Sequence, residues 1–287
     1  MRYLDYPAMK FLFLSVLFLP FFSGAQQRVQ LNLFGGFSNY QGDLQGKPFT
    51  LEQSDAAFGA GLSYYLTDHF LLRAGFVTGK VKASDKFNKP SLMVRNLDFQ
   101  TRISEGNLML EYNLFDMSEK KFSPYGFAGL AVYHFNPYTF DSSGAKILLQ
   151  PLSTEGQGLS QYPDRKAYKL TQLATLIGGG LKLRLSDNVL IAYEVGLRIL
   201  STDYLDDVSA TYVDEAALLA AKGPKAVELA YRGDELKNNN SSYPANGTRR
   251  GSPKLKDWYY FHGISLSIGL DLKRGTRTRY GCPAGVM

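Results

Sequence analysis

The sequence of 287 residues is poor in cysteine, in charged residues and in long apolar runs. A single cysteine excludes both an internal disulfide and a zinc site built from several cysteines. Charged residues make up only 20% and aromatic residues 14%, which excludes a disordered chain. After residue 25 no apolar run reaches the roughly 18 residues that a transmembrane helix requires. The 28 glycines, beside so many aromatic residues, instead favour an all-β architecture.

The first 25 residues predict an export signal. Met9 and Lys10 precede an apolar run over 11–22, and the small residues at 23–25 are typical of a cleavage site. The apolar run is too short to span a membrane. We therefore expect residues 1–25 to be a signal peptide and the mature protein to be exported.

Apolar and polar residues alternate in eight later segments. In the clearest of them, Val189, Ile191 and Tyr193 share one face while Glu194 and Arg198 share the other. Such alternation suits barrel strands that face lipid outside and a polar lumen inside, although a soluble β-sandwich also has one apolar face. The predicted strands span 29–40, 56–66, 70–82, 97–114, 124–135, 169–185, 189–200 and 257–272.

The connections between these segments alternate between short and long. Three are short, whereas 41–55, 83–96, 136–168 and 201–256 are long, as an eight-stranded barrel with both termini in the periplasm requires. Aromatic residues such as Tyr64 and Phe70 stand at strand ends, where interface girdles are expected. We predict an all-β fold, an eight-stranded antiparallel up-and-down transmembrane β-barrel over 26–273 in the outer membrane.

The longest connection contains its own local signals. Residues 214–222 predict a short helix, with Asp214 as its N-cap and Gly223-Pro224 at its end. Pro224 is placed to start a second short helix. The stretch 238–253 is rich in Asn, Ser, Gly and Pro, and we expect it to be mobile.

The lumen-facing positions of the predicted barrel carry several charges. An eight-stranded barrel is just wide enough to be filled by side chains, so these charges are expected to pair and close the interior; the alternative is a narrow ion path. The predicted lumen network comprises Arg73, Glu111, Lys182, Arg184, Glu194 and Arg198.

The sequence offers little that resembles a catalytic site. Its three histidines, His69, His134 and His262, fall on separate segments, and no Ser or Asp pattern accompanies them. We therefore expect neither an enzyme nor a cofactor.

Four acids follow the seventh predicted strand. Carboxylates at this density can hold Ca²⁺, but the EF-hand pattern is absent and turn or helix-cap chemistry is the favoured interpretation. The weak calcium candidates are Asp203, Asp206, Asp207 and Asp214.

The segment 274–287 is a basic tail expected in the periplasm. It begins directly after Lys273, and together these residues supply four cations and no acid, against a net charge of +6 for the whole chain. Such a segment can bind an acidic partner, cell-wall polymer or anionic headgroups, or it can be a solvated end to the last strand. The lone Cys282 suggests an intermolecular disulfide with a partner. The predicted partner-binding residues are Lys273, Arg274, Arg277, Arg279 and Cys282.

Several motifs together resemble the PorG family of outer-membrane barrels. They occupy 36–44, 124–137, 194–214, 250–259 and 282–283, with Ser252 where the family usually has Asn. The resemblance implies an anchor in the type IX secretion system of Bacteroidetes, which exports proteins and, in gliding species, motility adhesins. It implies docking to a periplasmic ring lipoprotein and its partner ring protein. A stand-alone structural or surface-binding barrel is the alternative.

Overall fold

The computed structural model describes residues 29–237, 242–254 and 256–270 of the chain. The predicted signal peptide lies outside the described residues. So does the basic tail, with Lys273, Arg274, Arg277, Arg279 and Cys282.

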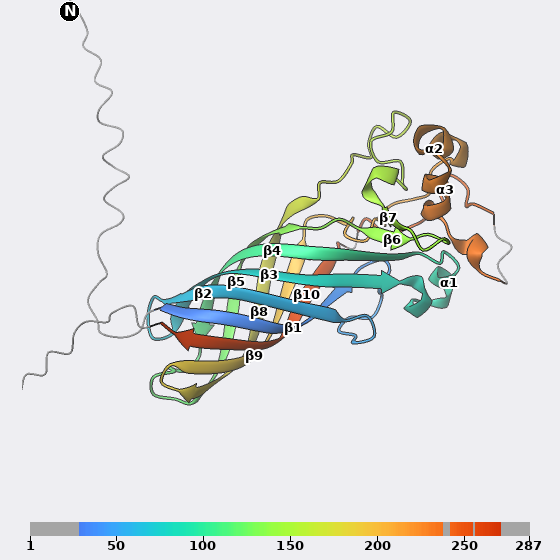
Figure 1. The fold of residues 1–287 in the computed structure, drawn as a ribbon. Coiled ribbons are helices and arrows are strands. Elements are labelled where there is room, and N and C mark those ends of the chain that lie inside the picture. Colours follow the sequence, from blue (N-terminus) through green and yellow to red (C-terminus); the bar gives the residue numbers. More distant parts are fainter. Residues whose placement is uncertain (1–28, 238–241, 255, 271–287) are drawn as a thin grey trace, which may run out of the picture.

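Within the described residues, eight long antiparallel strands close into an up-and-down barrel, which confirms the predicted fold (Figure 1). Each pairs with its neighbour in sequence order, and the first pairs with the last, from Gln30 opposite Gly269 to Gln41 opposite Trp258. The ends match the predicted segments to within a few residues. The barrel strands are β1 (Val29–Gln41), β2 (Asp55–Tyr65), β3 (Phe70–Ser84), β4 (Asp98–Asn113), β5 (Phe122–His134), β8 (Thr171–Ser186), β9 (Val189–Leu200) and β10 (Trp258–Gly269).

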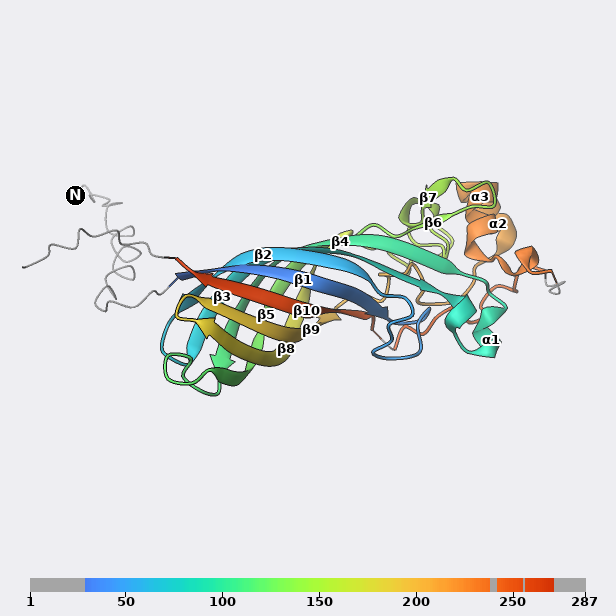
Figure 2. The ribbon, with the colours of Figure 1, turned by 60° about the horizontal axis from the view of Figure 1, so that its bottom comes forward.

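The two ends of the barrel differ, as the connection lengths predicted. Short turns join β2 to β3, β4 to β5 and β8 to β9 at one end. The described chain also starts and finishes at this end, where the Leu270 backbone N–H donates to the Val29 carbonyl over 2.9 Å. The four long connections gather at the opposite end, and we call the body that they form the cap (Figure 2).

The outer wall of the barrel is apolar because the strands alternate with period 2. Phe58 on β2 and Leu130 on β5 are 63% and 61% exposed, and similar side chains project from the other strands. The inward-facing residues that alternate with them along the strands, such as Ser63 and Tyr125, are buried in the lumen. An exposed apolar belt of this extent is the surface that a barrel presents to lipid.

Two strands continue past this belt into the cap. On the outer ends of β3 and β4 the outward residues become polar, with Lys80 opposite Arg102 and Lys82 opposite Gln100. The inward residues there are fully buried, and they include the apolar Val81 and Phe99 as well as Thr101. This change marks the boundary between the wall and the cap.

The cap contains short helices and a small hairpin. The helix expected after Asp214 is present, and Asp214 accepts a hydrogen bond from the Ala217 backbone N–H over 2.8 Å. The second helix, starting at Pro224, is also confirmed, whereas the hairpin was not predicted. The elements are η2 (Asp85–Phe87), α1 (Pro90–Met93), β6 (Tyr138–Phe140), β7 (Lys146–Leu148), η3 (Gln150–Leu152), α2 (Glu215–Lys222), α3 (Pro224–Ala230) and η4 (Gly233–Glu235).

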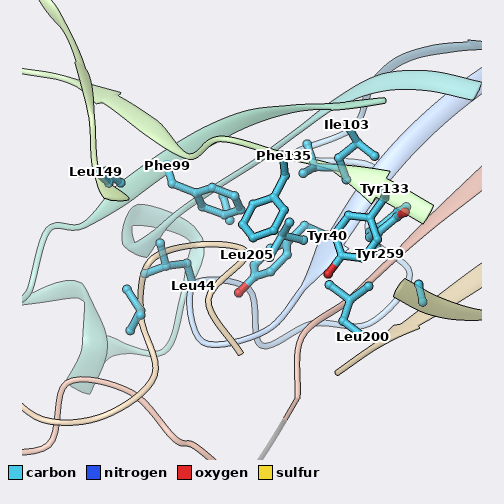
Figure 3. Packing of buried hydrophobic residues seen from close by; sticks show 14 of the residues in the cluster. Tyr40, Leu44, Phe99, Ile103, Tyr133, Phe135, Leu149, Leu200, Leu205 and Tyr259 are labelled. Atoms are coloured by element: carbon cyan, nitrogen blue, oxygen red, sulfur yellow. The ribbon is translucent and has the colours of Figure 1, made fainter. Parts of the chain in front are cut away.

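The largest apolar core lies where the barrel meets the cap (Figure 3). Inward aromatics from the strand ends, including Tyr133 and Tyr259, pack against loop residues such as Leu44 and Leu205. Tyr133 and Tyr259 meet edge to face, with ring centroids 5.6 Å apart. This packing fixes the loops to the barrel and so positions the polar groups described below.

No helix in the described part of the chain is long and apolar enough to cross a lipid bilayer.

Candidate functional site

Four of the six charged residues expected in the lumen lie together in its part nearest the short turns. Arg73 of β3 donates to Glu111 of β4 over 2.9 Å and to Glu194 of β9 over 3.0 Å. Lys182 of β8 contacts Glu111, and the Tyr125 hydroxyl donates to Glu194 over 2.7 Å. Because these side chains reach inward from four strands and Tyr125 from a fifth, they tie opposite walls together and fill the interior.

The other two predicted lumen residues lie elsewhere. Arg198 forms a bidentate pair with Glu105, over 2.8 and 2.9 Å, and Glu105 also accepts from the Tyr259 hydroxyl. Arg184 does not join either group, which corrects its placement in the network. It precedes the irregularity at the end of β8 and donates to the Ser118 carbonyl over 2.6 Å at the exposed rim.

Little open space remains beside these pairs. A cavity of about 50 Å³ is lined by Asn32, Arg73, Asn107 and their neighbours. A small-molecule site usually occupies several hundred Å³. The lumen is thus packed with side chains at this level.

The three histidines lie apart, as the sequence suggested. His69, in the turn before β3, has its Nδ1 atom 2.9 Å from the Asn113 carbonyl oxygen. His134 stands at the outer end of β5, beside Thr171. His262, on the outer face of β10, lies 3.1 Å from the Tyr193 hydroxyl.

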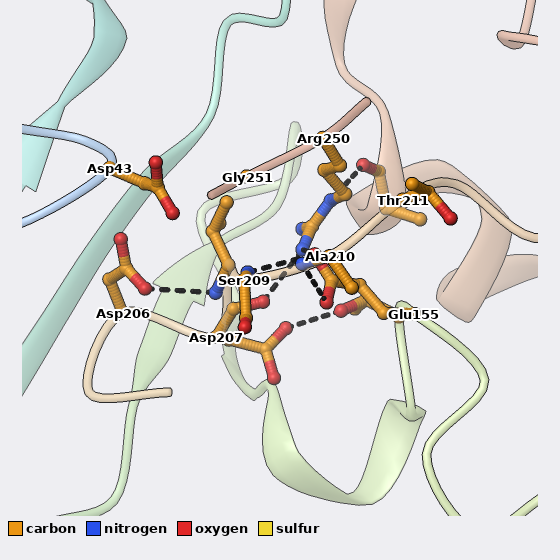
Figure 4. Close-up of polar contacts among 12 residues, drawn as sticks. Asp43, Glu155, Asp206, Asp207, Ser209, Ala210, Thr211, Arg250 and Gly251 are labelled. Carbon is orange, nitrogen blue, oxygen red and sulfur yellow. Dashed lines mark hydrogen bonds and ion pairs between the residues drawn. The ribbon is translucent and has the colours of Figure 1, made fainter. Parts of the chain in front are cut away.

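Arg250 is the centre of a buried polar cluster in the cap (Figure 4). It is 3% exposed and donates to the carboxylate of Glu155 over 3.0 Å and to the Asp207 carbonyl over 2.6 Å. Glu155 in turn accepts the backbone N–H groups of Ser209 and Ala210 over 3.0 and 2.8 Å. One ion pair therefore joins the β5–β8 connection to both ends of the β9–β10 connection.

A second arginine extends the cluster to the other two connections. Arg95 forms a bidentate pair with Asp85, over 2.7 and 3.0 Å, and contacts the Arg250 carbonyl. It also donates to the Asp43 carbonyl over 3.2 Å. The Asp43 carboxylate accepts the Ser252 backbone N–H over 2.8 Å. All four long connections are thus joined by buried polar contacts.

The third part of the cluster is a pair of aspartates, Asp206 and Asp257, whose carboxyl groups both contact the Tyr40 hydroxyl. The Tyr40 hydroxyl lies 2.5 Å from Asp206 Oδ2 and 3.1 Å from Asp257 Oδ1. The other carboxyl oxygens accept backbone N–H groups, Asp206 from Val208 and Asp257 from Leu205. A hydroxyl carries one proton, and a proton on either carboxyl group allows both contacts to be full hydrogen bonds, one donated by the tyrosine and one by the protonated acid.

Burial shifts the titration of this cluster upward. It raises the pKa of Asp206 and of Asp257 well above the usual range. The charge of Asp43 reinforces the shift at Asp206, that of Asp206 reinforces the shift at Asp257, and that of Asp203 reinforces both. Burial also raises the pKa of Asp203 to about 7, and that of Asp207 to about 6 despite nearby Arg250. In the described cap, buried carboxyl groups outnumber the guanidinium groups that could neutralise them, so the cluster retains protons near neutral pH.

The four calcium candidates do not act as one group. Asp203, Asp206 and Asp207 are buried close together in the cap, whereas Asp214 is exposed and caps α2. Asp206 and Asp207 are occupied by tyrosine, threonine and backbone donors. Within residues 29–237, 242–254 and 256–270, no three His, Cys, Asp or Glu side chains are arranged to hold a metal ion.

Sequence reasoning missed the residues that organise the cap. Glu155, Arg95 and Arg250 were not selected, and Arg250 and Ser252 lie in the stretch expected to be mobile although both are buried. A signal was nevertheless present, because three of the motifs that carry the family resemblance, 36–44, 194–214 and 250–259, meet here. A side chain at Gly251 would come within 2.7 Å of the Asp43 carboxylate and the Ser209 nitrogen, so this contact requires glycine.

Solved structures of several bacterial barrels are similar to this chain. Neisserial surface protein A is 9% identical, with a TM-score of 0.42, and the alignment covers 86% of this chain and 100% of that one. Ail of Yersinia pestis, solved with a heparin analogue, is 7% identical, with a TM-score of 0.40, and the alignment covers 84% of this chain and 97% of that one. The outer membrane protein OprG of Pseudomonas aeruginosa is 13% identical, with a TM-score of 0.39, and the alignment covers 85% of this chain and 98% of that one.

Comparison of the sequence with known families and proteins adds a second finding. No curated protein matches the sequence. A family model described as a domain of unknown function, DUF6089, matches residues 9–219, which is most of the chain and includes β1 to β9 and part of the cap. The protein therefore belongs to the DUF6089 family.

Proposed function

We propose that this protein is a non-enzymatic anchor that spans the outer membrane, with its cap at the cell surface. The observation that carries this proposal is the combination of an apolar outer belt with a lumen filled by ion pairs. The belt suits lipid, and the Arg73 and Lys182 pairs with Glu111 and Glu194 leave the barrel suited to holding other proteins in place rather than to conducting them.

The partner in this proposal is the periplasmic ring of the type IX secretion system. Its support is the resemblance to the PorG family, whose motifs run from 36 to 283 in order. The described chain starts and finishes at the end with short turns, so this end is the one proposed to face the periplasm. The basic tail with Cys282 is proposed to contact the ring.

A pull-down from membranes solubilised in mild detergent tests the partner. The full-length protein should retain a ring lipoprotein, and a chain ending at residue 273 should lose it while still reaching the outer membrane. Cys282→Ser reports separately on the disulfide, through loss of a high-mass band in non-reducing electrophoresis. Normal export of cargo in a clean deletion strain would overturn the secretion role.

A second candidate is a barrel whose surface binds a ligand outside the cell. The ordered cap favours it, because four connections held by Arg95 and Arg250 form a rigid support for α2 and α3. This candidate predicts that substitutions on the exposed face of α2, such as Leu219→Ser, abolish cell-surface binding, while removal of 274–287 has no effect. The anchor predicts the reverse pattern.

A further inference from the structure

A groove of about 600 Å³ lies on the outside of the barrel at the boundary between its apolar wall and the cap. It runs over the outer ends of β5 and β8 and the first residues after β9. Its lining combines Val132 and Leu173 from the wall with Lys166 and Lys169 from the β5–β8 connection. Apolar and cationic groups thus share one depression at this boundary.

The lower part of the groove is continuous with the surface that faces lipid. Val132 and Leu173 are direct partners in the β5–β8 ladder, and they are 52% and 61% exposed. Leu130 and Ile177 continue the same outward rows toward the middle of the wall. An acyl chain lying against the barrel here would remain in contact with apolar side chains along its length.

The upper part of the groove carries positive charge without a matching acid. Lys166 and Lys169 are exposed and form no ion pair with any described acid. The lysines on the neighbouring part of the same boundary differ, because Lys80 and Lys82 pair with Asp55 over 2.9 and 3.3 Å. The two groove lysines therefore retain their full charge for a ligand outside the chain.

Polar donors complete the lining. Thr171, Gln172, Ser201 and Thr202 line the same groove as the lysines, and within the chain Gln172 donates to the Lys169 carbonyl and Ser201 to Gln172. Two flexible ammonium groups with nearby hydroxyls match a phosphate ester, which accepts several hydrogen bonds and carries negative charge. A ligand that joins a phosphate to an acyl chain is a phospholipid or a phosphorylated glycolipid.

We propose that this groove binds a phosphorylated lipid of the outer leaflet, with its phosphate at Lys166 and Lys169 and an acyl chain along Val132 and Leu173. The inference rests on the proposed orientation, in which the cap is at the cell surface. Lysines at this depth extend toward the headgroup level while their methylene stems cover apolar surface. The bound lipid then fixes the depth of the barrel at this side.

Native mass spectrometry of the detergent-purified barrel tests the groove, with diphosphorylated lipid A as the probe. The wild type should retain one lipid A per barrel, and K166Q/K169Q should bind it roughly thirtyfold more weakly, as removal of two interfacial lysines implies. The matched control, K120Q/K121Q, changes two exposed lysines at the opposite rim and should bind as the wild type does.

Three results would overturn the proposal. These are equal retention by the wild type and K166Q/K169Q, equal weakening by the control pair, and equal retention of lipid A from which the phosphates have been removed. Inorganic phosphate at the same concentration should not displace the lipid, because it lacks the acyl contact. Cell fractionation decides independently whether the protein is in the outer membrane, so failure of the proposed location is distinguishable from failure of the groove.

Discussion

The carboxyl pair on Tyr40 makes the stability of the cap dependent on pH. Besides the hydroxyl proton of Tyr40, the pair retains one proton on Asp206 or Asp257, because burial and neighbouring carboxylates raise the pKa of both aspartates. The other carboxyl groups that face the pair are those of Asp43 and Asp203, and each adds negative charge when it is ionised. When the cap opens, water surrounds these carboxyl groups and their pKa values return to about 4.

The size of the effect follows from the number of protons released. Between about pH 4 and the raised pKa of the folded pair, one additional bound proton makes the closed cap less stable by about 1.4 kcal/mol for each pH unit. Asp207, with a pKa of about 6, and Asp203, with a pKa of about 7, shift stability in the same direction.

Asp257→Asn should reduce by one the number of protons that the closed cap releases on opening, and so weaken the dependence of its stability on pH. The asparagine carbonyl oxygen can accept the Leu205 backbone N–H, as the carboxylate does now over 2.9 Å. Its amide nitrogen can donate to the Tyr40 oxygen, so Tyr40 still donates to Asp206. The slope with pH should therefore decrease by about 1.4 kcal/mol per unit. Asp68→Asn, on the exposed turn before β3, is the matched control and should leave the slope unchanged.

Hydrogen exchange provides the assay. Peptides covering residues 202–212 report cap opening, and their protection is compared from pH 5 to pH 8 after correction for the intrinsic exchange rate. Protection in the wild type should fall as the pH rises, and less steeply in Asp257→Asn. Wild-type protection that does not fall with pH, or parallel slopes in the two proteins, would refute the retained proton.

Two further predictions concern the barrel. Arg198→Ala leaves a buried carboxylate without its partner and should cost about 3–5 kcal/mol in urea unfolding from lipid vesicles, whereas Arg184→Ala at the exposed rim should cost less than about 0.5 kcal/mol; equal losses would contradict the assigned positions. Gly129→Ala places a methyl group against a carbonyl oxygen of the adjacent strand and should cost about 1–3 kcal/mol in the same measurement. Gly126→Ala, whose nearest neighbour atom lies at 3.7 Å, should be tolerated, and similar behaviour of the two variants would show that the close approach does not limit packing.

The barrel could be predicted because its determinants are local. Alternation over about ten residues identifies each strand, and the spacing between strands gives the short and long connections. The helix after Asp214 was predicted for the same reason, since its N-cap residue, Asp214, and the Gly223-Pro224 pair at its end lie within one short segment. The lumen pairs of Arg73, Glu111, Lys182 and Glu194 follow from the inward positions once the strands are known.

The cap could not be predicted in the same way because its contacts join distant parts of the sequence. Arg250 and Glu155 are 95 residues apart, and Tyr40 and Asp257 are 217 apart. A polar, glycine-rich stretch indicates a loop, but it does not reveal that an arginine within it pairs with a buried carboxylate elsewhere in the chain. The β6–β7 hairpin has strands of only three residues, which is too short for a periodic signal. The prediction that 238–253 is mobile was wrong at Arg250, because the partners that hold Arg250 come from distant parts of the sequence.

The position of Tyr40 also has a consequence for the integrity of the barrel. Tyr40 belongs to β1, and Asp257 immediately precedes β10, so their hydrogen bond crosses the seam at which the first and last strands meet. Arg250 and Ser252 attach the same chain segment to the β1–β2 and β5–β8 connections. Lateral separation of β1 from β10 would therefore have to break these polar contacts in addition to the ladder. The cap thereby holds β1 and β10 together across the seam, and a barrel closed in this way resists lateral opening into the bilayer.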